Sequence, residues 1–126
     1  MSVSTENKTP HPTEINLHQK SRELEIAFDD DSRFHFSSEF LRVYSPSAEV
    51  RGHAPGEETL QVGKENVNIK ELEPVGNYAV KIVFTDGHDS GLYSWDLLYD
   101  YGQNQEQLWA DYLQRLKDAG HERKVN

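Results

Sequence analysis

The sequence has 126 residues, no cysteine, and 22 acidic against 13 basic residues, for a formal net charge of −9. A chain of this length can bury one core, and the lack of cysteine excludes disulfides and thiolate metal sites. The negative charge repels phosphate groups, so neither nucleic acid nor a membrane surface is expected as a partner. The first fifteen residues lack an apolar signal segment and no run is apolar enough to span a membrane, so we expect a cytoplasmic location.

The N-terminal segment is polar, and residues 1–13 are predicted to form a disordered tail. A single domain is expected over residues 14–119. At its start, apolar and polar residues alternate, which predicts strands around Ile15 and Ile26 and a return strand around Phe34.

A short helix is expected after the return strand. Ser37 or Ser38 is placed to accept its free backbone N–H groups, and Pro46 prevents it from continuing. The next segment, residues 45–58, holds two prolines and two glycines without periodicity and is predicted to be a loop.

Strands are expected to resume around residues 60–62, 67–72 and 78–84, where apolar and β-branched residues alternate with polar ones. A turn, a short return strand at residues 92–93 and a helix over residues 94–99 follow.

The chain uses one local pattern twice. Five residues recur at an offset of 56 positions: Ile26 and Ile82, Phe28 and Phe84, Asp30 and Asp86, Ser38 and Ser94, Leu41 and Leu97. Each copy contains a strand, an acidic turn, a return strand and a serine placed to cap a helix. The repeat predicts two similar structural units.

Residues 104–119 are predicted to form an amphipathic helix. Its apolar positions recur at helical spacing: Leu108, Trp109, Tyr112, Leu113 and Leu116. Asn104 and Gln107 are spaced like a capping box, and Gly120 is a suitable stop before a flexible tail at residues 120–126. The expected fold is α+β: a largely antiparallel twisted β-sheet of five to seven strands, two short helices, and the C-terminal helix packed on the sheet.

The string DGHDSGLYSW at residues 86–95, with Leu41-Arg42 and residues 75–79, resembles the gamma-butyrobetaine hydroxylase-like N-terminal domain, also called the DUF971 family. The resemblance covers about residues 13–101. It implies an accessory domain, which precedes the catalytic domain of gamma-butyrobetaine and trimethyllysine hydroxylases, accompanies some iron–sulfur carrier ATPases, or stands alone. Too few residues remain for an oxygenase domain, and we find no facial triad of two histidines and a carboxylate, so no enzymatic activity is expected.

The resemblance also implies where a structural zinc is held in family members that have one: a Cys-x-Cys-x-x-Cys loop and the histidine of the Asp-Gly-His turn. The matching positions here are Ser45, Ser47, Val50 and His88. Serine hydroxyls are poor zinc ligands at neutral pH and valine has no donor atom, so no cofactor is expected.

His88 and His53 remain as weak metal candidates, with Glu49 or Asp86 as further ligands. The alternative is that His88 sits in a surface turn and hydrogen-bonds across it. On that interpretation, His88→Ala costs less than about 1 kcal/mol.

The expected function is that of a non-enzymatic accessory or protein-interaction domain, with another protein as partner. The alternative is a metal-linked role, either residual zinc binding or assistance to iron–sulfur cluster carrier proteins. The candidate interaction residues lie in the loop, the acidic turn and the nearby aromatic segment: Arg51, His53, Asp86, His88, Tyr93 and Trp95.

Overall fold

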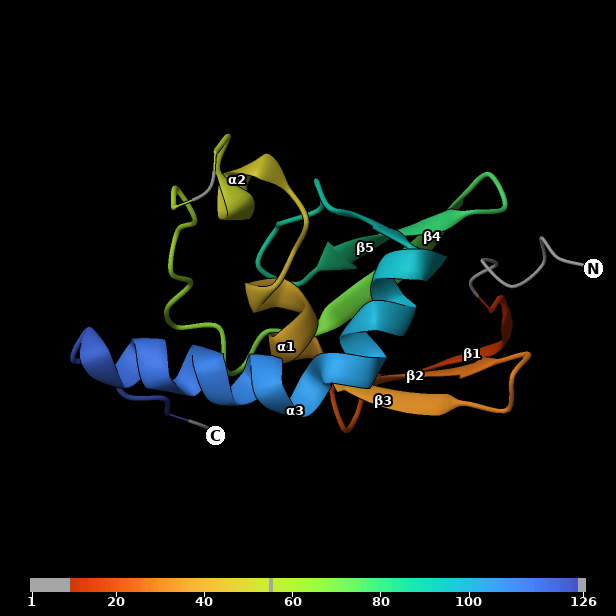
Figure 1. Ribbon diagram of the computed structural model, residues 1–126, viewed down its shortest axis with the longest axis horizontal. Helices are drawn as coiled ribbons and strands as arrows, with labels where there is room; N and C mark the ends of the chain where they lie inside the picture. Colours follow the sequence, from red (N-terminus) through yellow and green to blue (C-terminus); the bar gives the residue numbers. More distant parts are fainter. Residues whose placement is uncertain (1–9, 55, 125–126) are drawn as a thin grey trace, which may run out of the picture.

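The computed structural model describes residues 10–54 and 56–124, which contain two antiparallel sheets and three helices (Figure 1). The first sheet has the order β1 (Pro12–His18), β2 (Glu23–Phe28), β3 (Arg33–Ser37), and the second β4 (Ile69–Val75), β5 (Ala79–Phe84), β6 (Leu92–Ser94). The helices are α1 (Ser38–Val43), α2 (Ala48–Arg51) and α3 (Trp95–Asp118). The predicted α+β class is confirmed, although its six strands form two sheets instead of one.

The two central strands supply the middle of the core. Each places alternate side chains in the interior, Leu24, Ile26 and Phe28 from β2 and Val80, Ile82 and Phe84 from β5. All six are at most 4% exposed. Period-two alternation in the sequence therefore identified the buried face of both strands.

The predicted repeat is present in the structure. Strand β2 shifted by 56 positions coincides with β5, and each of the outer strands β1 and β4 carries a register irregularity near its start. The irregularity lies between Pro12 and Glu14 in β1 and between Ile69 and Glu71 in β4, opposite the last two residues of the central strand in both cases. The similarity thus extends to a local distortion that periodicity does not reveal.

Three local expectations differ from the structure. Strand β1 starts at Pro12, before the expected domain boundary, and the His11 backbone hydrogen-bonds with Asp29, while residues 1–9 of the predicted tail lie outside the described residues. The predicted loop contains the one-turn helix α2, which Ser47 caps. Residues 60–62 form no strand: the Gln61 carbonyl accepts from the hydroxyl of Tyr112 at 2.6 Å, and Leu60 packs beside α3.

Helix α3 is longer than expected. It is assigned from Trp95 to Asp118 and includes both the predicted short helix and the predicted terminal helix. The backbone leaves helical geometry at Asn104 (φ −114°, ψ 15°), so the helix has two limbs joined at a kink. The Asn104 side chain donates to the Asp100 carbonyl at 3.0 Å instead of capping a new helix.

The two limbs of α3 pack on different parts of the molecule. The first contacts β3 and β6, and at Gly102 it lies so close to β3 that an added Cβ would be 2.4 Å from the ring of Phe34. The second limb extends past the sheets and runs alongside α1 and the loop after α2 (Figure 1). Its buried Tyr112 and Leu116 pack against Val43 of α1. Leu108 and Trp109 pack against the main core, to which the strands contribute, so the apolar stripe of the terminal helix covers α1 as well as the sheet side.

The segment after α3 is attached to the domain. The helix ends at Asp118, and Gly120 follows with a left-handed backbone (φ +79°), as the sequence predicted. Arg123 then forms two hydrogen bonds, of 2.6 and 2.8 Å, with the carboxylate of Glu39 in α1. Residues up to Lys124 are thus held in place, while residues 125–126 lie outside the described part. No helix in that part is long and apolar enough to cross a membrane.

Candidate functional site

The loop after α1 and the turn after β5 meet at one corner of the molecule, which we call the serine–histidine corner. It consists of Ser45, Ser47, Glu49, His88 and Ser90, which the local structure brings together from both repeat units. The turn lies directly against the loop, because a Cβ added at Gly91 would be 2.6 Å from Ser45 Oγ. The corner therefore contains three of the four positions that the family resemblance associates with zinc, Ser45, Ser47 and His88, and the fourth, Val50, follows Glu49 in α2.

Hydrogen bonds run through the corner in a defined direction. His88 Nδ1 lies 3.1 Å from Glu49 Oε1, an ion-pair contact that favours the proton on Nδ1. With that tautomer, Nε2 accepts from Ser45 Oγ at 2.8 Å. Ser90 donates to the same carboxylate oxygen at 3.0 Å and contacts Ser47 Oγ at 2.7 Å. Every donor and acceptor at the centre of the corner is used.

The order Ser45, His88, Glu49 matches that of a nucleophile, a base and an orienting carboxylate. A nucleophile must also reach its substrate, and Ser45 is 0% exposed. Its oxygen additionally accepts from the Ser47 backbone N–H at 3.2 Å, a donor that would otherwise be free to stabilise an oxyanion. In this arrangement the buried Ser45 and His88 connect the two repeat units, while the Glu49 side chain lies at the surface.

Asp86 lies next to the corner and is held by three donors. Burial acts to raise its pKa, but hydrogen bonds from Lys64 (2.9 Å), the His88 backbone N–H (3.1 Å) and Arg42 (2.8 Å) lower the pKa to about 2. The pKa of His88 is lowered by burial and by the positive charge of Arg42, against the opposing pull of Glu49. The imidazole is therefore favoured in its neutral form.

The residues of the corner do not fit a tetrahedral zinc ion. Serine hydroxyls replace two thiolates, and the third position is Val50, a buried apolar side chain. The alternative ligand set is not assembled either: His53 is exposed, its N–H donates to Glu57, and no group of three or more His, Asp or Glu side chains able to hold a metal occurs in residues 10–54 and 56–124.

The remaining predicted interaction residues do not form one surface. Tyr93 is fully buried and donates to the Leu41 carbonyl at 2.5 Å, so it belongs to the core and not to an interaction surface. Trp95 is half-buried and donates to the Asn77 carbonyl at 2.9 Å. Arg51 is exposed on α2 and faces a different feature, which the sequence did not predict.

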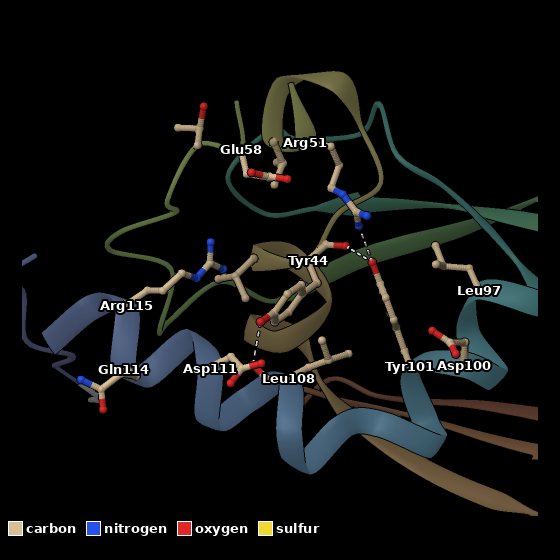
Figure 2. Close-up of a pocket in the computed structure, with 13 residues that line it drawn as sticks. Tyr44, Arg51, Glu58, Leu97, Asp100, Tyr101, Leu108, Asp111, Gln114 and Arg115 are labelled. Atoms are coloured by element: carbon tan, nitrogen blue, oxygen red, sulfur yellow. Dashed lines mark hydrogen bonds between the residues drawn. The ribbon is translucent and has the colours of Figure 1, made fainter. Parts of the chain in front are cut away.

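That feature is a cleft of about 640 Å³ between α1 and α2 on one side and the kinked α3 on the other (Figure 2). We call it the α3 cleft. Its walls include two aromatic rings, Tyr44 and Tyr101, and two guanidinium groups, Arg51 and Arg115. The sequence predicted only one part of this cleft: it singled out Arg51 but not the kink in α3, beyond which Arg115 lies.

A chain of hydrogen bonds fixes the inner wall of the α3 cleft. Arg51 donates from Nη1 to the Tyr101 hydroxyl at 3.1 Å, and that hydroxyl donates to the Tyr44 carbonyl at 2.6 Å. The Tyr44 hydroxyl donates to the Leu108 carbonyl at 2.6 Å, beside the kink. Burial raises the pKa of Tyr101, so its hydroxyl keeps its proton at neutral pH. Figure 2 shows Arg51 and Tyr101 pointing toward each other across the cleft.

Three solved structures are similar to this chain over most of its length. Two are NMR solution structures, with 53% and 47% sequence identity, TM-scores of 0.80 and 0.81, and coverage of 98% and 94% of this chain and 92% and 94% of those chains. The third is a crystal structure of a protein with unknown function of the DUF971 family from Acidithiobacillus ferrooxidans. It has 34% identity and a TM-score of 0.61, and covers 72% of this chain and 93% of that chain.

No curated protein matches the chain. The family described as gamma-butyrobetaine hydroxylase-like, N-terminal, matches residues 15–99, which include the serine–histidine corner and the first limb of α3 as far as Tyr99. Arg51 lies inside this match and Arg115 lies beyond it. Because the match spans well over half of the sequence, this chain belongs to the gamma-butyrobetaine hydroxylase-like N-terminal domain family, as its DGHDSGLYSW string indicated.

Proposed function

We propose that this protein is a non-enzymatic interaction domain that binds a partner protein through the α3 cleft. The observation that carries the proposal is the contrast between the two polar features of the molecule. The serine–histidine corner resembles a catalytic site but is closed, with Ser45 0% exposed, whereas the α3 cleft is open and lined by two arginines and two tyrosines. Arginine and tyrosine are the side chains that protein interfaces favour.

The construction of the cleft also supports a binding role. Its inner wall is rigid, because the Tyr44 and Tyr101 hydroxyls are both anchored on backbone carbonyls. Side chains that are held in place before binding lose little conformational entropy when a partner arrives. The proposal includes the expected cytoplasmic location.

Site-specific cross-linking tests the proposal. A photoreactive benzophenone side chain at Gln114, on the wall of the α3 cleft, should give one discrete adduct in the native cells. The same group at His35, exposed on β3, is the matched control and should give none. The captured protein, once purified, should shift the NMR signals of cleft residues and leave those of β3 unchanged. Equal cross-linking from both positions, or partner-induced shifts outside the cleft, would contradict the proposal.

The proposal further includes the absence of a zinc ion at the serine–histidine corner. Its support is the chemistry of the donor set, two serine hydroxyls and a valine in place of thiolates. Metal analysis of protein purified without a histidine tag should find no stoichiometric zinc or iron, and a chelator should leave the thermal unfolding midpoint unchanged. A stoichiometric metal whose removal lowers that midpoint would favour the metal-linked alternative, as would a cross-linked partner that carries iron–sulfur clusters.

A further inference from the structure

We infer that the surface formed by Glu39, Glu65 and Trp109 is a second binding site, which receives an arginine-bearing segment of a partner protein. In this structure the chain's own residues 121–124, which we call the C-terminal strap, occupy the site, and the partner segment displaces them. The inference does not depend on the α3 cleft, because none of these residues lines it.

The strap is held by an arginine that contacts two groups of the domain. Glu39 Oε2 accepts from Arg123 Nε at 2.8 Å, and Glu39 Oε1 accepts from Arg123 Nη2 at 2.6 Å. The guanidinium also lies over the ring of Trp109, with its central carbon 5.2 Å from the ring centroid. A carboxylate that accepts two N–H bonds beside an aromatic face selects a guanidinium over the ammonium group of lysine. The domain therefore presents a receptor for arginine.

The site also binds the main chain of the strap. The Glu65 carboxylate accepts from the Lys124 backbone N–H at 2.5 Å, and Asn66 donates from Nδ2 to the Lys124 carbonyl at 3.3 Å. Bonds to a peptide backbone do not depend on the side chains of the peptide. Another segment with arginine in the place of Arg123 can therefore form the same bonds.

The contacts that hold the strap are few and polar. All four of its residues are exposed, neither hydrophobic cluster contains one of its side chains, and Gly120 joins it to α3 with a left-handed backbone (φ +79°). By contrast, Glu39 is only 6% exposed, and no second cation lies at ion-pair distance from it in residues 10–54 and 56–124. The buried carboxylate therefore requires an arginine, whereas the core does not require this strap.

The strap leaves a hollow unfilled beside it. A groove of about 390 Å³ lies between residues 120–123 and the end of α3, where Leu113 and Leu116 line it and Leu113 is 38% exposed. The strap offers polar side chains to this groove, His121 and Glu122. Apolar residues in these two places would bury more apolar surface. The segment that fits best is therefore an arginine that follows two apolar residues, and the net charge of −9 favours a basic segment.

NMR titration of the whole native chain with three end-blocked tetrapeptides tests the inference. Leu-Leu-Arg-Lys should shift the backbone signal of Lys124 as its N–H leaves Glu65, while Leu-Leu-Gln-Lys should leave that signal in place. His-Glu-Arg-Lys, which repeats the sequence of the strap, should bind about tenfold more weakly than Leu-Leu-Arg-Lys. A tenfold difference corresponds to the burial of about two methylene groups.

Variants of the full chain test the displacement. Arg123→Ala opens the site, so it should bind Leu-Leu-Arg-Lys at least tenfold more tightly than the native chain, in which the strap competes. Lys124→Ala is the matched control, because it keeps Arg123 and the backbone contacts, and its affinity should equal that of the native chain. Glu39→Gln in the Arg123→Ala background should weaken binding by about tenfold, the effect of losing one charge-assisted hydrogen bond.

The inference is overturned if the arginine and glutamine peptides act alike on the native chain, or if Leu-Leu-Arg-Lys binds no more tightly than His-Glu-Arg-Lys. Equal affinity of the native chain and a folded Arg123→Ala variant would overturn it too, and if that variant does not fold, the titration of the native chain decides. A native dimer that Arg123→Ala abolishes would assign the site to the strap of a second copy, against the inference. Cross-linking from Gln114 tests the α3 cleft separately.

Discussion

The hydroxyl of Ser45 and Nε2 of His88 are 2.8 Å apart and join residues that are separated by 43 positions in the chain. Ser45 follows the helix of the first repeat unit, and His88 lies in the turn of the second. The bond is buried, since Ser45 is 0% and His88 is 8% exposed. One polar contact therefore ties the two units together at the serine–histidine corner.

Removal of this contact should destabilise the protein. In His88→Ala, the Ser45 hydroxyl loses its acceptor in a buried site, so the free energy of unfolding should fall by about 1–3 kcal/mol. This exceeds the cost of less than about 1 kcal/mol that the sequence predicted, because His88, although it lies in a turn, is only 8% exposed. Urea denaturation measures the change, with His35→Ala on the exposed side of β3 as a control that should stay within about 0.5 kcal/mol of the native chain. Equal effects would show that the corner adds no stability.

The closed position of Ser45 makes a second prediction. Fluorophosphonate probes react with serine hydroxyls that are both activated and accessible. The folded protein should not be labelled at Ser45, because its hydroxyl is fully buried although it contacts His88. Mass spectrometry of the treated protein checks this. A stoichiometric adduct on Ser45 that is lost in His88→Ala would assign a hydrolytic role to the corner and would contradict the proposed function.

The Asp86 carboxylate should make the free energy of unfolding depend on pH in the acidic range. Its pKa is about 2 in the folded chain and close to the ordinary 3.8 when unfolded, so its contribution is complete above pH 4 and is lost as the pH falls toward 2. After allowance for solvent screening, the contribution is about 1–2 kcal/mol. Asp86→Asn should be less stable than the native chain at pH 6, and the difference should shrink as the pH approaches 2. In an Arg42→Gln background the pH-dependent part should be smaller, and an unchanged profile there would rule out the ion pair as its cause.

Gly102 in the first limb of α3 gives a prediction with an unusual sign. Alanine in place of glycine inside a helix normally stabilises by about 1 kcal/mol. Here the added Cβ would lie 2.4 Å from the ring of Phe34, so Gly102→Ala should instead destabilise the protein by about 1–3 kcal/mol. Thermal unfolding measures the effect. In a Phe34→Leu background, which removes the ring, the same substitution should be neutral or favourable; a loss of similar size in both backgrounds would exclude the steric explanation.

Arg123 should hold the segment after α3 on the domain. The Glu39 carboxylate is only 6% exposed, and Arg123→Ala would leave it buried without its two-bond partner. The guanidinium also lies 5.2 Å from the ring centroid of Trp109. The expected loss is about 2–4 kcal/mol in the free energy of unfolding. Lys124→Ala is the control, because the contact of Lys124 with Glu65 comes from its backbone N–H and survives the substitution.

Local patterns predicted the two repeat units because their core strands alternate in the same way. Ile26 and Ile82 are both fully buried, and the offset between them is the offset between β2 and β5. The predictions that were wrong concern segments whose structure depends on tertiary contacts. Residues 60–62 have a strand-like composition but do not pair with a strand. The capping pattern at Asn104 does not start a new helix, because side chains of both limbs of α3 pack against the core.

The candidate site was predictable to a similar degree. The resemblance identified Ser45, Ser47, Val50 and His88, and the structure brings the loop and the turn that carry them together. Sequence reasoning did not show that the Glu49 carboxylate lies beside the His88 ring, since that contact depends on the one-turn helix α2. The α3 cleft was not predicted either, because Arg115 lies on the second limb of α3, beyond the bend at Asn104, and lines the same cleft as Arg51.

Helices α1 and α3 occupy the same place in the two repeat units but differ in length, and this difference explains why the molecule has the α3 cleft. Two identical halves would carry two equal helices and two equivalent open corners. Here α1 stops at Val43, while its counterpart continues to Asp118 and reaches across the first half. The second limb of α3 packs against α1. The space that remains beside the kink is the α3 cleft. The repeated pattern accounts for the common core of the two units, and the difference between α1 and α3 accounts for the cleft that we propose as the binding site.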